Sequence, residues 1–322
     1  MKKVFVENLK PGKEVVEFFV LRKQEIRDTA DGKRFLKLEL GDRTGRIDGV
    51  VWDNADHIYA QAQTGDVVKI QAQVTTYREM PQLKVERLRK AKEGEIELSD
   101  FLPASETDID SLNREFERVA SSIRNPHLKS LLELLLKDRS VTEKLKTTPG
   151  GKLWHHAYVG GLLQHTLRVV EICEKAAEMY ELVDRDLLIT GALIHDIGKI
   201  GSYSARGFFD YTDEGRLIGH VVSGDEIIDR KIRMIEDFPS ELALRLKHLV
   251  LSHQGQLEFA SPVVPKTLEA IILHYADDLD AKADAFSHII KTQKSKGKRW
   301  SDWVNLINRY IYLGQDQPED DS

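Results

Sequence analysis

The feature that most constrains the fold is a change of pattern near residue 92 of this 322-residue chain. Before it, short apolar segments alternate with turn residues, and after it, long segments repeat apolar residues at helical spacing. Strands followed by helices favour two domains, one all-β and one all-α, over a single mixed fold. We therefore expect a β domain at 1–92, a linker at 93–110, a helical domain at 111–315 and a disordered acidic tail at 316–322.

The N-terminal segment from 14 to 88 predicts three strands, a short helix and two further strands. This order is typical of the OB fold, a small barrel that binds oligonucleotides. Alternation in the second strand puts three leucines on one face and Phe35 on the other. Because such barrels hold single strands by stacking and by phosphate contacts, we expect binding residues here, although barrel aromatics more often fill cores. The stacking candidates are Phe35, Trp52 and Tyr77, and the phosphate partners are Arg22, Lys37, Arg78 and Lys84.

Composition limits the classes of protein to which the chain can belong. Its formal net charge of −6 argues against a general polyanion binder, although residues 1–90 contain more basic than acidic side chains. The single cysteine, Cys173, excludes an intramolecular disulfide and fits a reducing cytoplasm. No segment approaches membrane-spanning length, so we expect a soluble cytoplasmic protein without a membrane partner.

Chemistry is indicated where an apolar helical segment ends in charged residues, at ALIHDIGK (192–199). Buried charges are costly unless they are paired or bind metal, and His195 with Asp196 could satisfy either condition. Partners lie roughly one helix and one loop apart, so antiparallel helices can bring them to one centre. These are His165, His220, His253 and Asp277. Nitrogen and oxygen donors without thiolate suit Mn, Fe, Ni or Zn, and the set suffices for two ions bridged by Asp196.

Other residues near this set have two interpretations each. Lys199 lies one helical turn after His195 and Asp196 and can donate to a phosphate oxygen, or it can be a solvated cation at a helix end. His156 lies in a segment with glycine pairs at both ends, which suggests a flexible lip and a phosphate contact, or a polar loop. Asp278 and Asp280 compete with Asp277 as the ligand, and Asp280, one turn beyond Asp277, could instead support the ligands.

A basic run follows the segment that contains Asp277. KTQKSKGKRWSDW (291–303) is either a solvated loop with Trp300 and Trp303 anchoring a final helix, or an extension of a positive path toward the metals.

The metal-ligand set resembles the H…HD…D signature of the HD superfamily of metal-dependent phosphohydrolases. His165, the His195–Asp196 pair and Asp277 match that signature, and His220 and His253 match the extra histidines of its two-metal members. The phrases GGLLQHTLRV, ALIHDIGK and HYADDLDAK, downstream of an OB-like domain, are together similar to the YhaM-type 3′-to-5′ exoribonucleases of Gram-positive bacteria. The resemblance covers nearly the whole chain.

The resemblance implies an enzyme that degrades single-stranded RNA from the 3′ end and releases nucleoside monophosphates, with single-stranded DNA as a second candidate substrate. A metal-activated hydroxide would attack the phosphodiester, and catalytic roles would fall to Asp196 and Lys199. The cofactor would be two divalent ions, Mn²⁺ first, with Fe, Ni, Co or Zn as alternatives. Two other functions stay open: an HD phosphohydrolase of small nucleotides, acting on triphosphates or cyclic nucleotides, and a non-enzymatic nucleic-acid-binding adaptor.

Overall fold

The structure, a computed structural model, divides the chain into two compact units. One comprises Met1–Glu106 with Tyr203–Thr212, and the other comprises Thr107–Ser202 with Asp213–Ser322. The residues described are 2–29, 31–92, 94–97, 100–102, 107–152, 155–205, 208–294, 298–305 and 307–314. The predicted tail at 316–322 and part of the predicted linker lie outside them.

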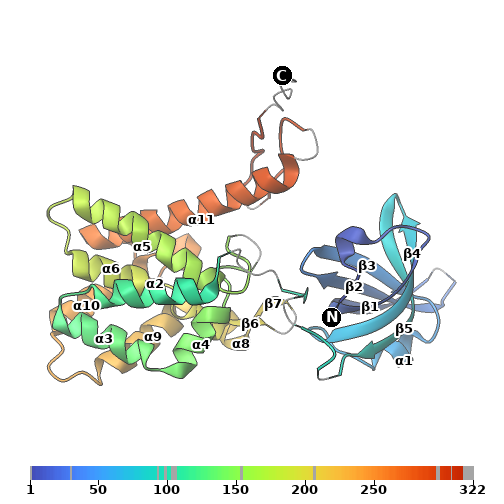
Figure 1. The fold of residues 1–322 in the computed structure, drawn as a ribbon, viewed down its shortest axis with the longest axis horizontal. Coiled ribbons are helices and arrows are strands. Elements are labelled where there is room, and N and C mark those ends of the chain that lie inside the picture. Colours follow the sequence, from blue (N-terminus) through green and yellow to red (C-terminus); the bar gives the residue numbers. More distant parts are fainter. Residues whose placement is uncertain are drawn as a thin grey trace. The chain divides into compact units, whose positions relative to one another are not determined.

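The first unit is a closed five-stranded barrel with a short helix between its third and fourth strands (Figure 1). Its strand order is β1-β2-β3-β5-β4, which confirms the predicted OB fold. The long first strand closes the barrel because one end of it pairs with β4 and the other with β2. The elements are β1 (Glu14–Asp28), β2 (Arg34–Asp42), β3 (Gly45–Val51), α1 (Ala55–Tyr59), β4 (Val67–Tyr77) and β5 (Met80–Lys90), preceded by the 3-10 turn η1 (Val6–Asn8).

The barrel core follows from the alternation in the sequence. Leu36, Leu38 and Leu40 on β2 are buried inside the barrel, whereas Phe35 and Lys37 are on its outer side. Burying one face of each strand in this way sets the register, because a shift by one residue would exchange the two faces.

Segments outside the strands complete the first unit. Phe101, which falls in the predicted linker, is buried in a small cluster with Phe18 and Val20 of β1. Phe208 packs against the same cluster from the turn between β6 (Tyr203–Ala205) and β7 (Phe209–Tyr211), which pair antiparallel. This hairpin belongs to the barrel unit although it is inserted between helices in the sequence.

The second unit is a helical bundle around one large apolar cluster (Figure 1). Side chains of Asp108, Asn125, Asp138 and Asp184 accept hydrogen bonds from backbone N–H groups of the first turns, so local sequence starts these four helices. Its helices are α2 (Ile109–Ser121), α3 (Pro126–Leu136), α4 (Arg139–Thr147), α5 (Gly161–Met179), α6 (Arg185–Ile194), α7 (Lys199–Ser202), α8 (Asp213–Leu217), α9 (His220–Ile232), α10 (Ser240–Ser252) and α11 (Leu268–Lys294), with the 3-10 turn η3 (Leu257–Phe259).

The last helix of the second unit, α11, is 27 residues long and continues past the other helices (Figure 1). Beyond it, β-bridges join Trp300 to Tyr312 and Val304 to Arg309, so a hairpin stands where the sequence suggested a final helix. Among the described residues, no helix is both long and apolar enough to cross a membrane.

Candidate metal centre

The six predicted metal ligands come from five helices or helix ends and meet in the second unit. They are His165 in α5, His195 and Asp196 after α6, His220 at the start of α9, His253 at the end of α10 and Asp277 in α11. All are buried or partly buried.

These side chains form two groups of three. The ligand atoms of His165, His195 and Asp277 lie within 4.8 Å of one another, and so do those of Asp196, His220 and His253. Each group offers imidazole nitrogens and one carboxylate, the donors that borderline divalent ions prefer.

Asp196 joins the two groups. Its Oδ2 lies 3.4 Å from His195 Nε2 and 3.6 Å from His165 Nε2. Its Oδ1 lies 3.3 Å from His220 Nε2 and 3.5 Å from His253 Nε2. One carboxylate oxygen therefore faces each group, which is the arrangement of a bridging ligand.

The same local device orients His195 and His253. Each residue ends a helix, and each Nδ1–H donates to the carbonyl oxygen three residues earlier, Ala192 at 2.9 Å and Val250 at 2.7 Å. Since Nδ1 is used as a donor, Nε2 keeps its lone pair and turns toward Asp196. Their helices can approach because α6 has Gly191 at the contact.

A second glycine brings His220 into the centre. A Cβ built on Gly198 would lie 2.0 Å from the His220 carbonyl oxygen, so only glycine permits the turn after Asp196 to lie against the start of α9. The turn also ends α6 at Ile194, and α7 begins at Lys199.

Asp277 and Asp280 lie on opposite sides of His165. Asp277 Oδ1 is 3.1 Å from His165 Nε2, whereas Asp280 Oδ2 accepts from His165 Nδ1 at 2.7 Å. Burial opposes protonation of His165, but hydrogen bonds with the two carboxylates outweigh it and raise the pKa of the imidazole to about 9. Despite burial, the same contacts hold the pKa values of both carboxyls below their usual range.

Buried polar atoms test whether these residues fit metal ions. Among the described residues, neither oxygen of Asp196 nor Nε2 of His220 has a hydrogen-bond partner. Leaving such atoms unsatisfied in the interior costs roughly 1–3 kcal/mol each, and more for a charged group. Although burial favours a neutral Asp196, nearby Lys199 and His195 hold its pKa well below the usual range. A buried carboxylate with free lone pairs between four imidazoles fits two cations.

Lys199 is tied into the centre. Its Nζ lies 2.6 Å from Asp196 Oδ2 and donates to the Gly150 carbonyl oxygen at 2.6 Å. The side chain is buried, which rules out the alternative of a solvated lysine after a helix end.

His156 lies behind the ligands. Its ring is buried, its Nε2 is 2.8 Å from Asp280 Oδ2, and its Nδ1 is 2.7 Å from the Tyr158 hydroxyl. With both nitrogens engaged, the ring orients Asp280 instead of facing a substrate phosphate. The neighbouring glycines serve close packing, since a Cβ on Gly161 would lie 1.9 Å from the His156 carbonyl oxygen.

Two supporting residues were not predicted from the sequence. Asp284 Oδ2 accepts from the His156 backbone N–H at 2.9 Å, and the Gln254 amide lies 2.9 Å from His253 Nε2. Asp284 is one helical turn after Asp280, so helical spacing could have suggested it. Nothing in the sequence pairs Gln254 with the centre except its position beside His253.

On the barrel, four predicted nucleic-acid residues share the outer face of β2, β3 and β5. The rings of Phe35 and Trp52 stack with centroids 5.0 Å apart, and Trp52 is 49% exposed. Lys37 and Lys84 are aligned across strands through Val50, which pairs with both. Lys37 also pairs with Asp48 at 3.4 Å, and Lys84 is exposed.

The other three lie elsewhere on the barrel. Tyr77 is exposed at the turn between β4 and β5, beside Arg78, whose guanidinium is 5.4 Å from its ring. Arg22 is partly buried, with its guanidinium 4.7 Å from the Phe208 ring and 3.4 Å from Glu39. The structure therefore groups Phe35, Trp52 and Lys84 but holds Arg22 in contacts within the unit.

Comparison with known proteins finds a matching family for a region of each unit. A family model described as the HD domain matches residues 162–282, and one described as an OB-fold nucleic acid binding domain matches residues 20–91. Three proteins described as 3′-5′ exoribonuclease YhaM are similar to the chain along most of its length. The Bacillus subtilis (strain 168) protein is 30% identical over 94% of this chain and 95% of its own. The Bacillus velezensis protein is 32% identical over the same shares, and that of Geobacillus sp. (strain WCH70) is 31% identical over 93% and 92%.

Proposed function

The chain belongs to the YhaM family of 3′-5′ exoribonucleases, and we propose that it hydrolyses single-stranded RNA from the 3′ end and releases nucleoside monophosphates. The observation that carries this proposal is the bridging position of Asp196 between two groups of metal-ligating side chains. The direction of degradation is supported by the relatives, whose names state it.

We propose two divalent ions as the cofactor, Mn²⁺ first, with Fe, Ni, Co or Zn as alternatives. His165, His195 and Asp277 would hold one, His220 and His253 the other, and Asp196 both. When bound, the ions supply Lewis acidity that activates water and stabilises charge on phosphate oxygens. The protein's own contribution is orientation: Nδ1 hydrogen bonds fix the rings of His165, His195 and His253 with Nε2 inward.

Lys199 is proposed to contact the substrate. An ammonium group has three donors. Lys199 donates one to the Gly150 carbonyl oxygen and forms an ion pair with Asp196 that is not a hydrogen bond. A remaining donor can reach a non-bridging phosphate oxygen and stabilise the charge that develops there.

The barrel is proposed to hold the RNA strand through Phe35 and Trp52, with Lys84 beside them. Stacking is sequence-tolerant, so single-stranded DNA is the second candidate substrate. A cytoplasmic location is part of the proposal and is supported by the single buried free cysteine, Cys173.

The test uses 5′-labelled single-stranded RNA and Mn²⁺, with products resolved on a denaturing gel. Wild type should give a metal-dependent ladder that shortens from the 3′ end, and Asp196→Asn should give none. Because Asp196 is buried, circular dichroism must show that the variant folds. His220→Gln, at the partly exposed edge of the centre, provides a second ligand variant. RNA left intact by wild type would refute the proposal.

A further inference from the structure

The residues after α11 form a hairpin with two different faces. Backbone N–H groups of Ser301 and Leu313 donate to the carbonyl oxygens of Ile311 and Arg299, both at 2.9 Å. Ile311 and Leu313 are buried in a small cluster that also contains Ile289 of α11. Since side chains alternate along a strand, the residues between them point away from this cluster.

The outward face carries four aromatic rings: Trp300, Trp303, Tyr310 and Tyr312 are 54%, 47%, 56% and 49% exposed. Trp300 packs edge-on against Tyr312 with centroids 5.1 Å apart, and Trp303 against Tyr310 at 5.0 Å. Large aromatic rings that are half-exposed and lie together usually mark a binding surface.

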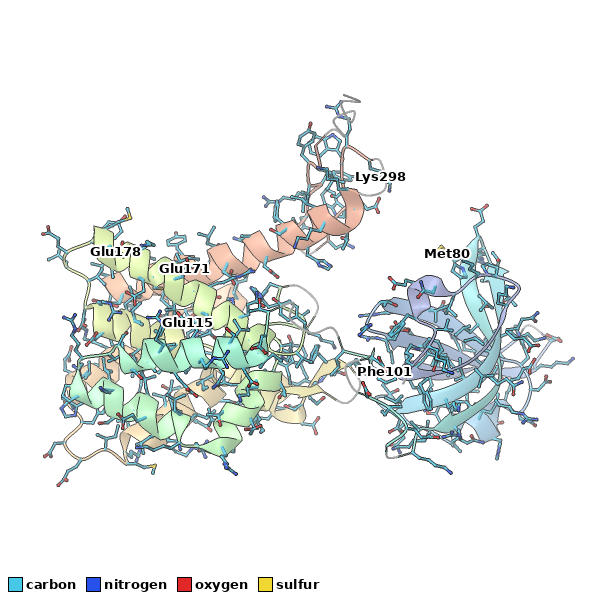
Figure 2. All side chains as sticks on the ribbon, viewed as in Figure 1. Met80, Phe101, Glu115, Glu171, Glu178 and Lys298 are labelled. Carbon is cyan, nitrogen blue, oxygen red and sulfur yellow. The ribbon has the colours of Figure 1, made fainter. Side chains whose placement is uncertain are left out.

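The approach to this face is basic. In residues 291–299 five of nine side chains are Lys or Arg and none is acidic, within a chain of net charge −6. Of these, Lys291, Lys294, Lys298 and Arg299 are described and exposed. Figure 2 shows Lys298 at the far end of α11, where it also pairs with Asp302 at 2.8 Å.

We propose that the aromatic hairpin (298–313) and the basic end of α11 form a second surface for single-stranded RNA, in addition to the barrel residues. Rings that stack on bases beside cations that meet phosphates are the elements of sequence-tolerant single-strand binding. Neither matched family region, 20–91 or 162–282, includes this segment. The proposal rests on the proposed function, since it concerns how the substrate RNA is held.

Charge favours RNA over a second copy of the chain. Two hairpins meeting face to face would bring two basic segments together, whereas a polyanion neutralises them. The single acidic side chain described in the hairpin is Asp302, and it already pairs with Lys298.

The length of α11 determines how long an RNA must be to reach both the metal centre and the aromatic hairpin. From Asp277 at the metal centre to Lys294 the helix advances 17 residues, or about 25 Å at 1.5 Å per residue. A stacked strand advances about 3.4 Å per nucleotide, so about seven nucleotides span this distance. Short oligonucleotides held at the metal centre should therefore not contact the hairpin.

The experiment measures binding of fluorescein-labelled oligouridylates of about 20 and about 5 nucleotides by anisotropy, with Ca²⁺ in place of Mn²⁺ to fill the metal centre and slow cleavage, and with a gel to show that the RNA stays intact. The Trp303→Ser/Tyr310→Ser double variant should bind the long RNA at least about tenfold more weakly and the short RNA within about twofold of wild type. Trp303→Phe/Tyr310→Phe keeps the rings and should restore most of the affinity. Tyr180→Ser, an exposed tyrosine after α5, is the matched control.

A charge variant tests the basic segment independently. Lys291→Gln, Lys294→Gln and Arg299→Gln together should bring the negative slope of log affinity against log salt closer to zero by about 2, at about 0.7 per lost phosphate contact. Exposed lysines of the same unit, changed as Lys129→Gln, Lys137→Gln and Lys175→Gln, should leave the slope unchanged.

Unchanged affinity of the ring variant for the long RNA, or equal losses for both lengths, would overturn the proposal. If RNA affinity is unchanged and light scattering shows that the variant is a smaller oligomer, the hairpin is instead an interface between copies. The proposed function is judged separately, by Mn²⁺-dependent cleavage of the short RNA by wild type.

Discussion

Replacing Asp280 by asparagine tests a residue that supports the predicted metal ligand His165 without changing the ligand itself. Asp280 Oδ2 accepts from His165 Nδ1 at 2.7 Å and lies 2.8 Å from His156 Nε2. The asparagine carbonyl oxygen has two lone pairs and can still accept from both rings, but it carries no charge and is a weaker acceptor than a carboxylate oxygen. His165 would then be held less strongly and would lose part of its basicity.

Loss of such an outer partner typically lowers metal affinity by 10–100-fold, or about 1.4–2.7 kcal/mol. Near pH 7 a part of this loss is offset. The wild-type imidazole, with its pKa raised to about 9, must release a proton to bind metal, and Asp280→Asn lowers that pKa. The affinity ratio between wild type and variant should therefore be larger near pH 8.5 than near pH 7.

Isothermal titration calorimetry with Mn²⁺ under anaerobic conditions measures two quantities, the affinity for the metal and the number of protons released on binding. Titrations in buffers of different ionisation enthalpy count released protons, and Asp280→Asn should release fewer than wild type near pH 7. Asp278→Asn, an exposed side chain on the same helix paired with Lys282, is the matched control and should change neither quantity. Affinity within twofold of wild type at both pH values would refute the assigned role of Asp280.

Three further predictions concern stability and RNA binding. The pKa of His165 is about 9 in the folded protein and 6.5 in the unfolded chain, so protonation of His165 should stabilise the metal-free protein by up to about 3 kcal/mol below pH 6.5. This stability should be lost as the pH rises toward 9, and denaturant midpoints that rise over the same range would contradict the prediction. Gly198→Ala would place a Cβ 2.0 Å from the His220 carbonyl oxygen and should lower the melting temperature by about 5 °C or more, whereas Gly45→Ala, whose nearest contact is at 3.5 Å, should not. Equal melting temperatures for the two variants would refute the claim that only glycine fits at position 198. Trp52→Ala should weaken single-stranded RNA binding by roughly 5–150-fold in anisotropy titrations, with little change in melting temperature. Tyr59→Ala, which removes another exposed ring of the barrel unit, is the control, and an equal effect of the two variants would reject base stacking.

Local pattern was enough to predict both halves of the fold. Leu36, Leu38 and Leu40 alternate with outward residues because a strand has a period of two, and the structure confirms that face as the barrel core. Helix starts are also encoded locally, since a cap residue such as Asp184 accepts from an N–H group only three residues away.

Local pattern failed for the C-terminal hairpin. Tyr310, Ile311, Tyr312 and Leu313 alternate over only four residues, too few to outweigh the helical context before them. The structure forms a hairpin there because Ile311 and Leu313 can pack against the end of α11, a contact that local spacing does not encode.

The sequence by itself indicated a candidate metal centre, because His195 and Asp196 at the end of an apolar helical segment must find partners in the interior, and the resemblance to the HD signature singled out Asp277. The sequence did not determine the arrangement of these side chains. Asp277 and Asp280 are chemically identical and three residues apart, so only the packing of α11 against α5 decides which nitrogen of His165 each one meets. The position of Asp196, with one oxygen toward each group, likewise depends on the close approach of α6, α9 and α10 that Gly191 and Gly198 permit. Such contacts join residues far apart in the chain, and tertiary packing alone sets their distances.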